Sequence, residues 1–361
     1  MADPDARLAG IVRLADFEPL AREAMDPAAW DFIASGSWDE VTLAENDAAW
    51  LRRRLRPRVL VDVSKVDPAT KFLGSPSAFP LAIAPMAVHG IAHPDAEVAT
   101  ARAAASAGVP FTLSTMASGS IEDVAAAAPD ATCWFQLYAQ RDRGLSRSFV
   151  ERAAAAGYEA IVLTVDLAVL GYRERDLRSG FELPALGNFP ALPPTHRPGV
   201  GPASDGILGD RPPRGVSWDD LASIRSWSSL PLVLKGIMTA EDATLAAEHG
   251  VEAIVVSNHG ARQLDRVRAP VDVLAEIVRA VDGRTEVWVD GGVRRGLDIA
   301  IALALGAQGV LLGRPVLWAL ATAGQAGVER ALAILRHEFE LTLALLGART
   351  PADIRPEHLV R

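Results

Sequence analysis

The segment AIVVSNHGARQ, residues 253–263, joins a short apolar run to an abrupt polar end. Its β-branched first half is typical of a strand buried on both faces, and the polar residues with a glycine end that strand. The imidazole of His259 titrates near neutral pH and can take a proton from a substrate. The guanidinium of Arg262 can hold a carboxylate through two hydrogen bonds. Taken alone, the pair also fits a core histidine and a solvated arginine, so the rest of the chain decides between them.

Residues 79–347 repeat this pattern of an apolar strand followed by a helix. We expect eight strands, at 81–85, 111–115, 133–138, 160–166, 232–236, 253–258, 287–291 and 310–314. Helical spacing follows most of them, at 96–107, 121–127, 145–156, 240–249, 271–281, 297–305 and 328–346. Near-continuous apolar strands that alternate with helices predict an α/β fold, a (β/α)8 TIM barrel. A doubly wound open sheet is the alternative.

Three segments lie outside the repeat. Residues 1–78 show helical spacing at 14–22, 27–34 and 39–53, and we expect them to form a helical cap over one end of the barrel. Residues 178–216 follow the fourth strand and are rich in proline and glycine, which is typical of an active-site lid. Residues 348–361 form a tail, and the chain 1–361 is expected to be a single domain.

The composition limits the partners. A net charge of -9 at pH 7 disfavours nucleic acid or an anionic membrane as the main partner. With Cys133 alone there is no intrachain disulfide, and neither a signal peptide nor a membrane span is recognisable, so we expect a cytoplasmic protein. His89 and His93 have the spacing of a helical metal pair, but Gly90 and Pro94 disfavour a helix there, so no metal site is expected.

Polar side chains collect where the expected strands end, and the carboxyl ends of the strands carry the active sites of such barrels. Each alone could cap a helix or form an ion pair, but their recurrence at one point of the repeat favours a functional site. The residues at these strand ends are Met86 and the polar Ser114, Gln136, Tyr138, Thr164, Asp166, Lys235, Ser257, His259, Arg262, Asp290 and Arg314.

The last two strands indicate a phosphate site. Asp290-Gly291-Gly292 and Gly313-Arg314 combine backbone N–H groups with positive charge, at the place where barrels of this fold often bind phosphate. Glycine permits close approach of the backbone to a ligand. Many unrelated barrels share this feature, so it names no cofactor, and no G-x-G-x-x-G motif opens a helix after a strand.

Lys235 has two interpretations. A barrel lysine can form a Schiff base, or its charge can stabilise the anion of an electron-rich ring such as a reduced flavin. Ser114, Gln136 and Thr164 would suit the donors and acceptors of such a ring. Asp166 could hold His259 in one tautomer and stabilise its cation.

Several of these segments strongly resemble the FMN-dependent 2-hydroxy-acid oxidase and dehydrogenase family, which includes glycolate, lactate and mandelate enzymes. The similar segments are 257–265, 289–296 and 312–316, together with 135–138, 163–166, 235–237, 32–37 and 42–46. The similarity covers nearly the whole chain, apart from 178–216.

The resemblance implies His259 as the catalytic base, with Asp166 as its partner. Arg173 and Arg262 would bind the substrate carboxylate, and Tyr138 would face the substrate hydroxyl. It also implies a homo-oligomer, a tetramer or octamer, that passes electrons to oxygen or another acceptor. FMN would contact Pro85, Met86, Ala87, Ser114, Gln136, Thr164, Lys235, Ser257, Asp290, Gly291, Gly292, Arg294, Gly313 and Arg314.

Two positions depart from the family pattern. Phe32 stands where members acting on short-chain acids carry a tyrosine, and the missing hydrogen bond is worth about 0.5–1.5 kcal/mol. Val88 replaces a small residue of some lactate-using relatives and is expected close to the substrate side chain. We therefore expect a larger apolar 2-hydroxy acid as the substrate. An FMN-dependent isomerase of a phosphorylated substrate and a non-catalytic module that binds a phosphorylated ligand are the alternatives.

Overall fold

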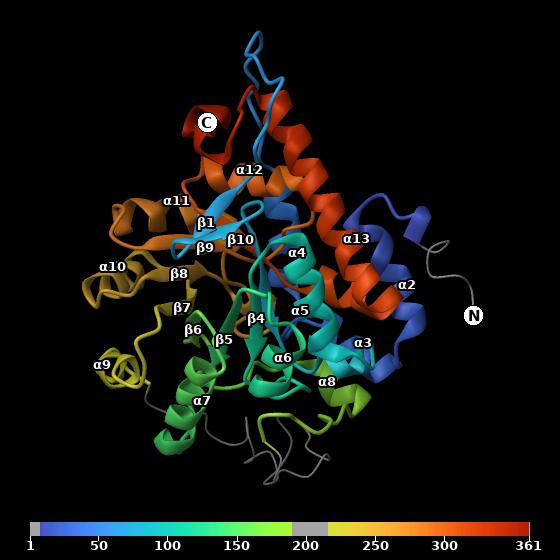
Figure 1. Ribbon diagram of the computed structural model, residues 1–361, viewed down its shortest axis with the longest axis vertical. Coiled ribbons are helices and arrows are strands. Elements are labelled where there is room, and N and C mark those ends of the chain that lie inside the picture. The colour runs from blue at the N-terminus through green and yellow to red at the C-terminus, as the bar shows by residue number, and fades with distance from the viewer. Residues whose placement is uncertain (1–7, 190–215, 361) are drawn as a thin grey trace.

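The computed structural model describes residues 8–189 and 216–360, which form a (β/α)8 barrel (Figure 1). Its parallel strands close in the order β10-β3-β4-β5-β6-β7-β8-β9. The barrel prediction is confirmed, the open sheet is wrong, and each strand lies within two residues of its expected range. The strands are β3 Leu81–Met86, β4 Phe111–Ser114, β5 Cys133–Leu137, β6 Ala160–Thr164, β7 Leu232–Ile237, β8 Ala253–Val256, β9 Glu286–Val289 and β10 Gly309–Leu312.

Helices surround the barrel, and several have clear capping residues. Ser120 and Thr239 accept the N–H groups of Asp123 and Asp242 at the starts of α6 and α10. One helix is longer than expected, because α13 begins directly after β10 and bends at Gly324, whose φ is +58°. The helices are α5 Ala96–Ala107, α6 Ile121–Ala127, α7 Arg143–Ala155, α8 Glu174–Ser179, α9 Asp220–Arg225, α10 Ala240–Glu248, α11 Pro270–Val281, α12 Gly296–Ala304 and α13 Arg314–Leu346.

The N-terminal segment forms the expected helices. Its helices α2 Phe17–Ala24, α3 Pro27–Ala34 and α4 Val41–Leu51 pack against α13, α8 and α11. An antiparallel hairpin, β1 Thr70–Phe72 and β2 Ser75–Ser77, follows them and lies at the end of the barrel opposite α3 and α8 (Figure 1). Strands of three residues are too short to show a sequence period, so the hairpin could not be predicted.

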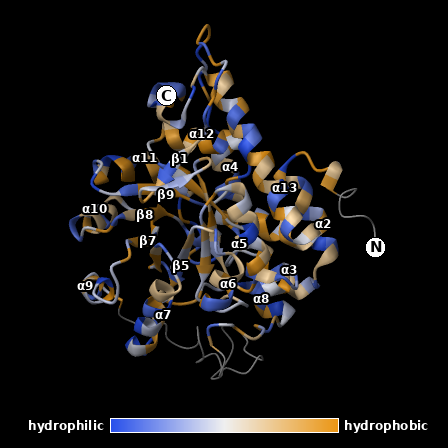
Figure 2. Cartoon of the chain, in the orientation of Figure 1, coloured by the Kyte–Doolittle hydropathy of each residue, from blue (hydrophilic) through white to orange (hydrophobic). Residues whose placement is uncertain are grey.

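The barrel interior has a floor made of three aromatic rings. Trp134 and Trp288 stack with centroids 4.9 Å apart, and the ring of Phe72 from the hairpin packs edge-on at 5.8 and 5.2 Å. Gly309 makes room for this plug, because a Cβ there would lie 2.4 Å from the Phe72 ring. Small and branched residues fill the rest of the interior cluster, and Figure 2 shows the apolar strands at the centre of the molecule.

The polar ends of the strands continue the inward-facing rows of this cluster. On β7, Val233 lies in the apolar interior, and Lys235 follows two residues later. On β9, Trp288 is followed in the same way by Asp290. Side chains two residues apart point to the same side of a strand, so the same rows that form the core also supply the polar mouth.

The described part of the expected lid, residues 178–189, packs against the barrel. Leu183, Leu186 and Phe189 are buried. Asn188 Oδ1 accepts the N–H of Ile121, and a Cβ on Gly187 would lie 2.3 Å from the backbone of Gly119. This stretch therefore forms a fixed wall, and residues 190–215 lie outside the described residues. Within the described part of the chain, no helix is long and apolar enough to cross a membrane.

Replacing Phe72 by alanine is expected to lower the free energy of unfolding by about 3–5 kcal/mol, because it deletes the ring that closes the barrel floor. Chemical denaturation followed by circular dichroism measures the change. Leu60→Ala is the matched control, since Leu60 is fully exposed in the same N-terminal segment and should change stability by less than about 0.5 kcal/mol. Equally small effects of both substitutions would contradict the role of Phe72.

Candidate active site

A cavity of about 1240 Å³, partly open to solvent, lies at the carboxyl ends of the strands. Most of the residues singled out from the sequence line it. They are Phe32, Pro85, Met86, Ala87, Ser114, Tyr138, Thr164, Arg173, Lys235, His259, Arg262, Asp290, Gly291, Gly292, Arg294, Gly313 and Arg314.

Three further expected residues lie directly behind this lining. Gln136 accepts a hydrogen bond from Ser114 Oγ at 3.1 Å and donates one to Thr164 Oγ1 at 3.0 Å. Ser257 Oγ accepts from Lys235 Nζ at 2.8 Å and from the His259 N–H at 3.1 Å. Asp166 contacts His259. These three residues hold the groups that reach the cavity.

Val88 lies elsewhere than expected. Its side chain is completely buried in the main hydrophobic core and does not belong to the cavity lining. The backbone is left-handed at this residue, with φ +46°, and its N–H donates to the Met116 carbonyl at 3.0 Å. Met116 is the neighbour that lines the cavity. The expected contact between Val88 and the substrate side chain is therefore not supported.

His259 and Asp166 form a hydrogen-bonded pair beside Tyr138. The distance from His259 Nδ1 to Asp166 Oδ1 is 2.8 Å, and His259 Nε2 lies 3.3 Å from the Tyr138 hydroxyl. Burial lowers the pKa of His259, and the positive charges of Lys235 and Arg173 lower it further. The carboxylate of Asp166 raises this pKa, but the net shift is downward. The imidazole is therefore neutral at neutral pH, and with Nδ1–H donating to Asp166, Nε2 is free to accept a proton.

A pair of asparagines holds the strained turn that carries His259. Residues 259, 260 and 261 all have left-handed backbones, with φ of +59°, +63° and +63°. Such conformations cost free energy for residues other than glycine. Asn258 Oδ1 accepts the N–H of Ala261 at 3.1 Å, and its amide exchanges two hydrogen bonds with the amide of Asn46 on α4. Asn46 has no predicted role in the sequence, because its partner is more than 200 residues away.

Lys235 is a charged ammonium group. Its Nζ lies 3.0 Å from Asp290 Oδ2 in a buried ion pair. Burial alone would lower the pKa of Lys235, but the carboxylates of Asp290 and Asp166 outweigh burial and raise it. A lysine that forms a Schiff base needs a lowered pKa, so the structure favours the charge-stabilising interpretation of Lys235.

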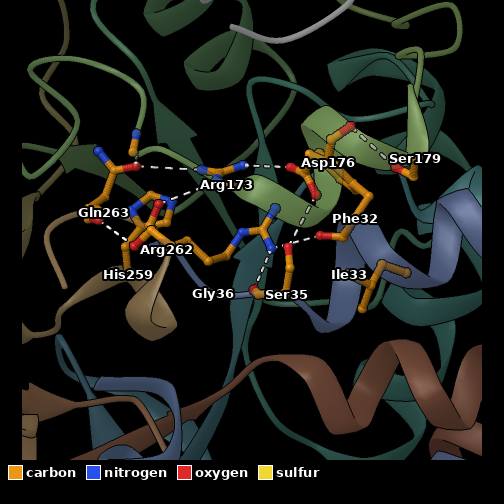
Figure 3. Close-up of polar contacts among 12 residues, drawn as sticks. Phe32, Ile33, Ser35, Gly36, Arg173, Asp176, Ser179, His259, Arg262 and Gln263 are labelled. Carbon is orange, nitrogen blue, oxygen red and sulfur yellow. Dashed lines mark hydrogen bonds and ion pairs between the residues drawn. The ribbon is translucent and has the colours of Figure 1, made fainter. Parts of the chain in front are cut away.

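Arg173 and Arg262, two of the arginines that line the cavity, are held mainly by backbone carbonyls (Figure 3). Arg173 Nε donates to the carbonyl of Arg262 at 3.2 Å. Arg262 Nη1 donates to the carbonyls of Phe32 at 2.7 Å and Ser35 at 3.0 Å, at the end of α3. The Arg262 guanidinium carbon also lies 5.0 Å from the centre of the Phe32 ring, which stacks on Phe181 at 4.3 Å.

The opposite part of the cavity fits the phosphate and ring of a flavin mononucleotide. Arg314 and Arg294 bring positive charge to it, while Ser114, Gln136 and Thr164 offer neutral donors and acceptors. A Cβ on Gly313 would meet only the Met86 sulfur, at 3.9 Å, so this glycine leaves the backbone open to a ligand. Asp290 Oδ1 is buried and has no hydrogen-bond partner among the described residues, as expected of an acceptor that awaits a ligand.

The two glycines after β9 are explained by packing against a neighbouring helix and not by space for a ligand. Gly291 and Gly292 have positive φ, of +85° and +81°. A Cβ on Gly292 would lie 2.0 Å from the carbonyl oxygen of Asn46, so this glycine is required by packing against α4. The tight turn at these glycines lets the loop line the cavity on one side while α4 packs against its other side.

Comparison with known proteins agrees with this geometry. Residues 21–361 match the model of the family described as FMN-dependent dehydrogenase. An L-lactate oxidase of Nostoc sp. is 49% identical over 352 residues, which cover 95% of this chain and 96% of that protein. A glycolate oxidase of Spinacia oleracea is 45% identical over 354 residues, covering 97% and 95%. The crystal structure of a mandelate oxidase with (S)-4-hydroxymandelic acid superposes with a TM-score of 0.90 at 43% identity, covering 97% and 98%.

The protein is therefore a flavin-dependent oxidoreductase with a TIM barrel. More closely, the chain belongs to the FMN-dependent dehydrogenase family, in the branch that contains the 2-hydroxy-acid oxidases, and its cofactor is FMN.

Lys235→Met is expected to lower the free energy of unfolding of the FMN-free protein by about 3–5 kcal/mol, because it leaves Asp290 buried without a cation. Adding Asp290→Asn should recover most of the loss, since it removes the unpaired charge. Denaturant titration measures both. Arg147→Met breaks an exposed ion pair with Glu151 and is the control, with an expected loss below about 1 kcal/mol. Equal losses in the single and double Lys235 variants would contradict this account.

Proposed function

We propose that this protein oxidises (S)-2-hydroxy acids with a medium or large apolar side chain to 2-oxo acids. The observation that carries the proposal is the neutral imidazole of His259, aimed at a cavity that Arg173 and Arg262 also line. A base and two cationic groups on one cavity suit a substrate that carries a carboxylate next to the carbon to be oxidised. FMN supplies the acceptor for the two electrons, which then pass to oxygen or to another acceptor.

The side chains of this site have separate tasks. Arg173 and Arg262 bind the substrate carboxylate, and Tyr138 faces the hydroxyl group. His259 Nε2 takes a proton from the substrate, and Asp166 stabilises the imidazolium that forms. Lys235 keeps a positive charge at the ring-binding part of the cavity.

The preference for an apolar side chain is supported by the cavity walls. Phe32 presents a ring without a hydroxyl, and Leu167, Leu170 and Leu183 line the same cavity. Leu183 belongs to the segment that packs firmly against the barrel, so its wall is part of the fold. Burying the side chain of a larger substrate against these walls contributes favourable free energy that glycolate cannot obtain.

The two alternatives have less support. The relatives named above are oxidases, which favours oxidation over isomerisation of a phosphorylated substrate. A binding module without chemistry would have no task for the paired His259 and Asp166. We further propose a homo-oligomer, a tetramer or octamer, in the cytoplasm, and gel filtration of the purified protein tests its assembly.

A substrate panel tests the proposed function. Anaerobic addition of (S)-mandelate or a long-chain (S)-2-hydroxy acid should bleach the flavin absorbance. The kcat/KM for these acids should exceed that for glycolate by about tenfold or more, since each buried group adds to binding in the transition state. (R)-Mandelate is the control and should react far more slowly. The highest kcat/KM with glycolate would contradict the preference, and no bleaching by any hydroxy acid would contradict the function.

The pH dependence of kcat/KM tests the base. Activity should fall with decreasing pH through a pKa below 6.5, because burial holds the pKa of His259 below its usual value and only the neutral form accepts a proton. Asp166→Asn removes a charge that raises this pKa, so the acid limb should move to lower pH while kcat falls by about 10²–10⁴-fold.

Asp130→Asn, an exposed substitution, is the control and should leave the profile unchanged. An Asp166→Asn enzyme with the wild-type acid limb and rate would show that the pair does not act in the reaction.

A further inference from the structure

The site that we propose for the substrate carboxylate places the buried guanidinium group of Arg173 near that of the half-buried Arg262. Burial lowers the pKa of Arg173, and the neighbouring charge of Arg262 lowers it further. Burial also lowers the pKa of Arg262. Like charges out of water repel strongly, so this pair requires a compensating negative charge even before a substrate arrives.

Asp176 is a carboxylate whose charge acts on both guanidinium groups. It lies on α8, one helical turn after Arg173, and only 6% of the residue is exposed. Its Oδ2 is 3.8 Å from Arg173 Nη1, and its Oδ1 accepts a hydrogen bond from Ser35 Oγ at 3.1 Å (Figure 3). The sequence offered no sign of this role, since Ser35 and Asp176 are 141 residues apart.

The separation of 3.8 Å has a specific consequence. It allows Coulomb attraction but exceeds the distance of about 2.7–3.2 Å for an N–H···O hydrogen bond. Oδ2 accordingly has no hydrogen-bond partner among the residues that the structure describes. A carboxylate in two-pronged contact would occupy the N–H groups that a substrate needs. Asp176 instead balances the charge and leaves those donors available.

Neighbouring elements fix Asp176 in this place. Ser35 directly follows α3, and Asp31 on α3 forms an ion pair with Arg175, the residue before Asp176. Arg175 Nη1 also lies 3.7 Å from Glu40 Oε1. Burial raises the pKa of Asp176, with Asp31 acting in the same direction and Arg262, Arg173 and Ser35 against it. With two cations beside it, the carboxyl is ionised at neutral pH.

We propose that Asp176 is a positioning residue that limits the affinity of the site for carboxylates. It acts through Arg173 and Arg262, whose positive charge it balances. Substrate and product are both carboxylates, so a site without this balance would hold the product too tightly. The inference rests on the proposed function, because it takes a carboxylate as the ligand of the arginine pair.

The test compares a charged and a neutral ligand on the FMN-loaded enzyme. Phenylacetate carries the carboxylate but lacks the reacting hydroxyl, and 2-phenylacetamide has the same shape without charge. In Asp176→Asn, the Kd of phenylacetate from flavin absorbance titration should fall by about tenfold or more, because a buried negative charge near the ligand is gone. The Kd of the amide should stay within about twofold.

Steady-state kinetics give a second readout. KM for the hydroxy acid and kcat should both fall in Asp176→Asn, since the product leaves more slowly. Chloride should become a competitive inhibitor of the variant and not of the wild type. A purely structural role of Asp176 would weaken both ligands alike and create no chloride inhibition.

Three further variants separate charge from other effects. Asp176→Ala also removes the charge and repeats the test if the asparagine variant does not yield holoenzyme. Asp176→Glu keeps the charge and should keep the wild-type Kd within about threefold. Glu174→Gln removes one negative charge from the solvent side of the same helix and should change neither Kd.

The outcomes distinguish the two proposals. Unchanged or weaker binding of phenylacetate by both neutral variants overturns the role of Asp176, while the proposed function stands if the wild type oxidises hydroxy acids. Wild-type enzyme that binds the amide as tightly as phenylacetate has no carboxylate site, and this result overturns both proposals.

Discussion

Two-residue alternation along the barrel strands is the constraint on which this site depends. Each strand contributes one row of side chains to the interior, and the row changes from apolar to polar near the carboxyl end. Trp134 precedes Gln136, Val233 precedes Lys235, and Trp288 precedes Asp290. A shift of one residue would turn each polar group toward the surrounding helices. The same rows supply both the aromatic floor of Phe72, Trp134 and Trp288 and the polar groups of the mouth, so the register of the core sets the position of the chemistry.

This alternation explains how much of the protein could be predicted. Strand positions and polar strand ends are local features, so His259, Lys235 and Asp166 were found in the sequence, and their grouping at one mouth followed from the fold. Contacts between distant segments leave no such local pattern. The Asn46–Asn258 amide pair and the Ser35–Asp176 hydrogen bond became visible only in three dimensions.

Local backbone conformation set the remaining limit on prediction. Val88 was expected at the substrate because it replaces a small residue of some lactate-using relatives, but its backbone has a left-handed φ and its side chain does not line the cavity. Phe32 was expected only as an apolar wall, and the structure shows that it also lies against the guanidinium of Arg262. A residue type predicts the chemistry that is available, while φ and the neighbouring elements determine where that chemistry is placed.

The end of α3 connects the two halves of the site. The Ser35 carbonyl accepts hydrogen bonds from Arg262 and from Arg314, at 3.0 and 2.8 Å. Carbonyl groups at a helix C-terminus carry partial negative charge, so they can hold two cations without neutralising either.

The ion pairs of the charged side chains around the cavity indicate which ligands the cavity can bind. Lys235 is matched by Asp290 and Arg294 by Asp47, whereas Arg173 and Arg262 share Asp176. Arg314 donates its hydrogen bonds to carbonyl groups within the described part of the chain. Positive charge therefore remains at two places in a protein whose net charge is -9. One is suited to the phosphate of FMN and the other to a carboxylate, and the Ser35 carbonyl holds an arginine at each, so one fixed point of the fold positions the positive charge at both places.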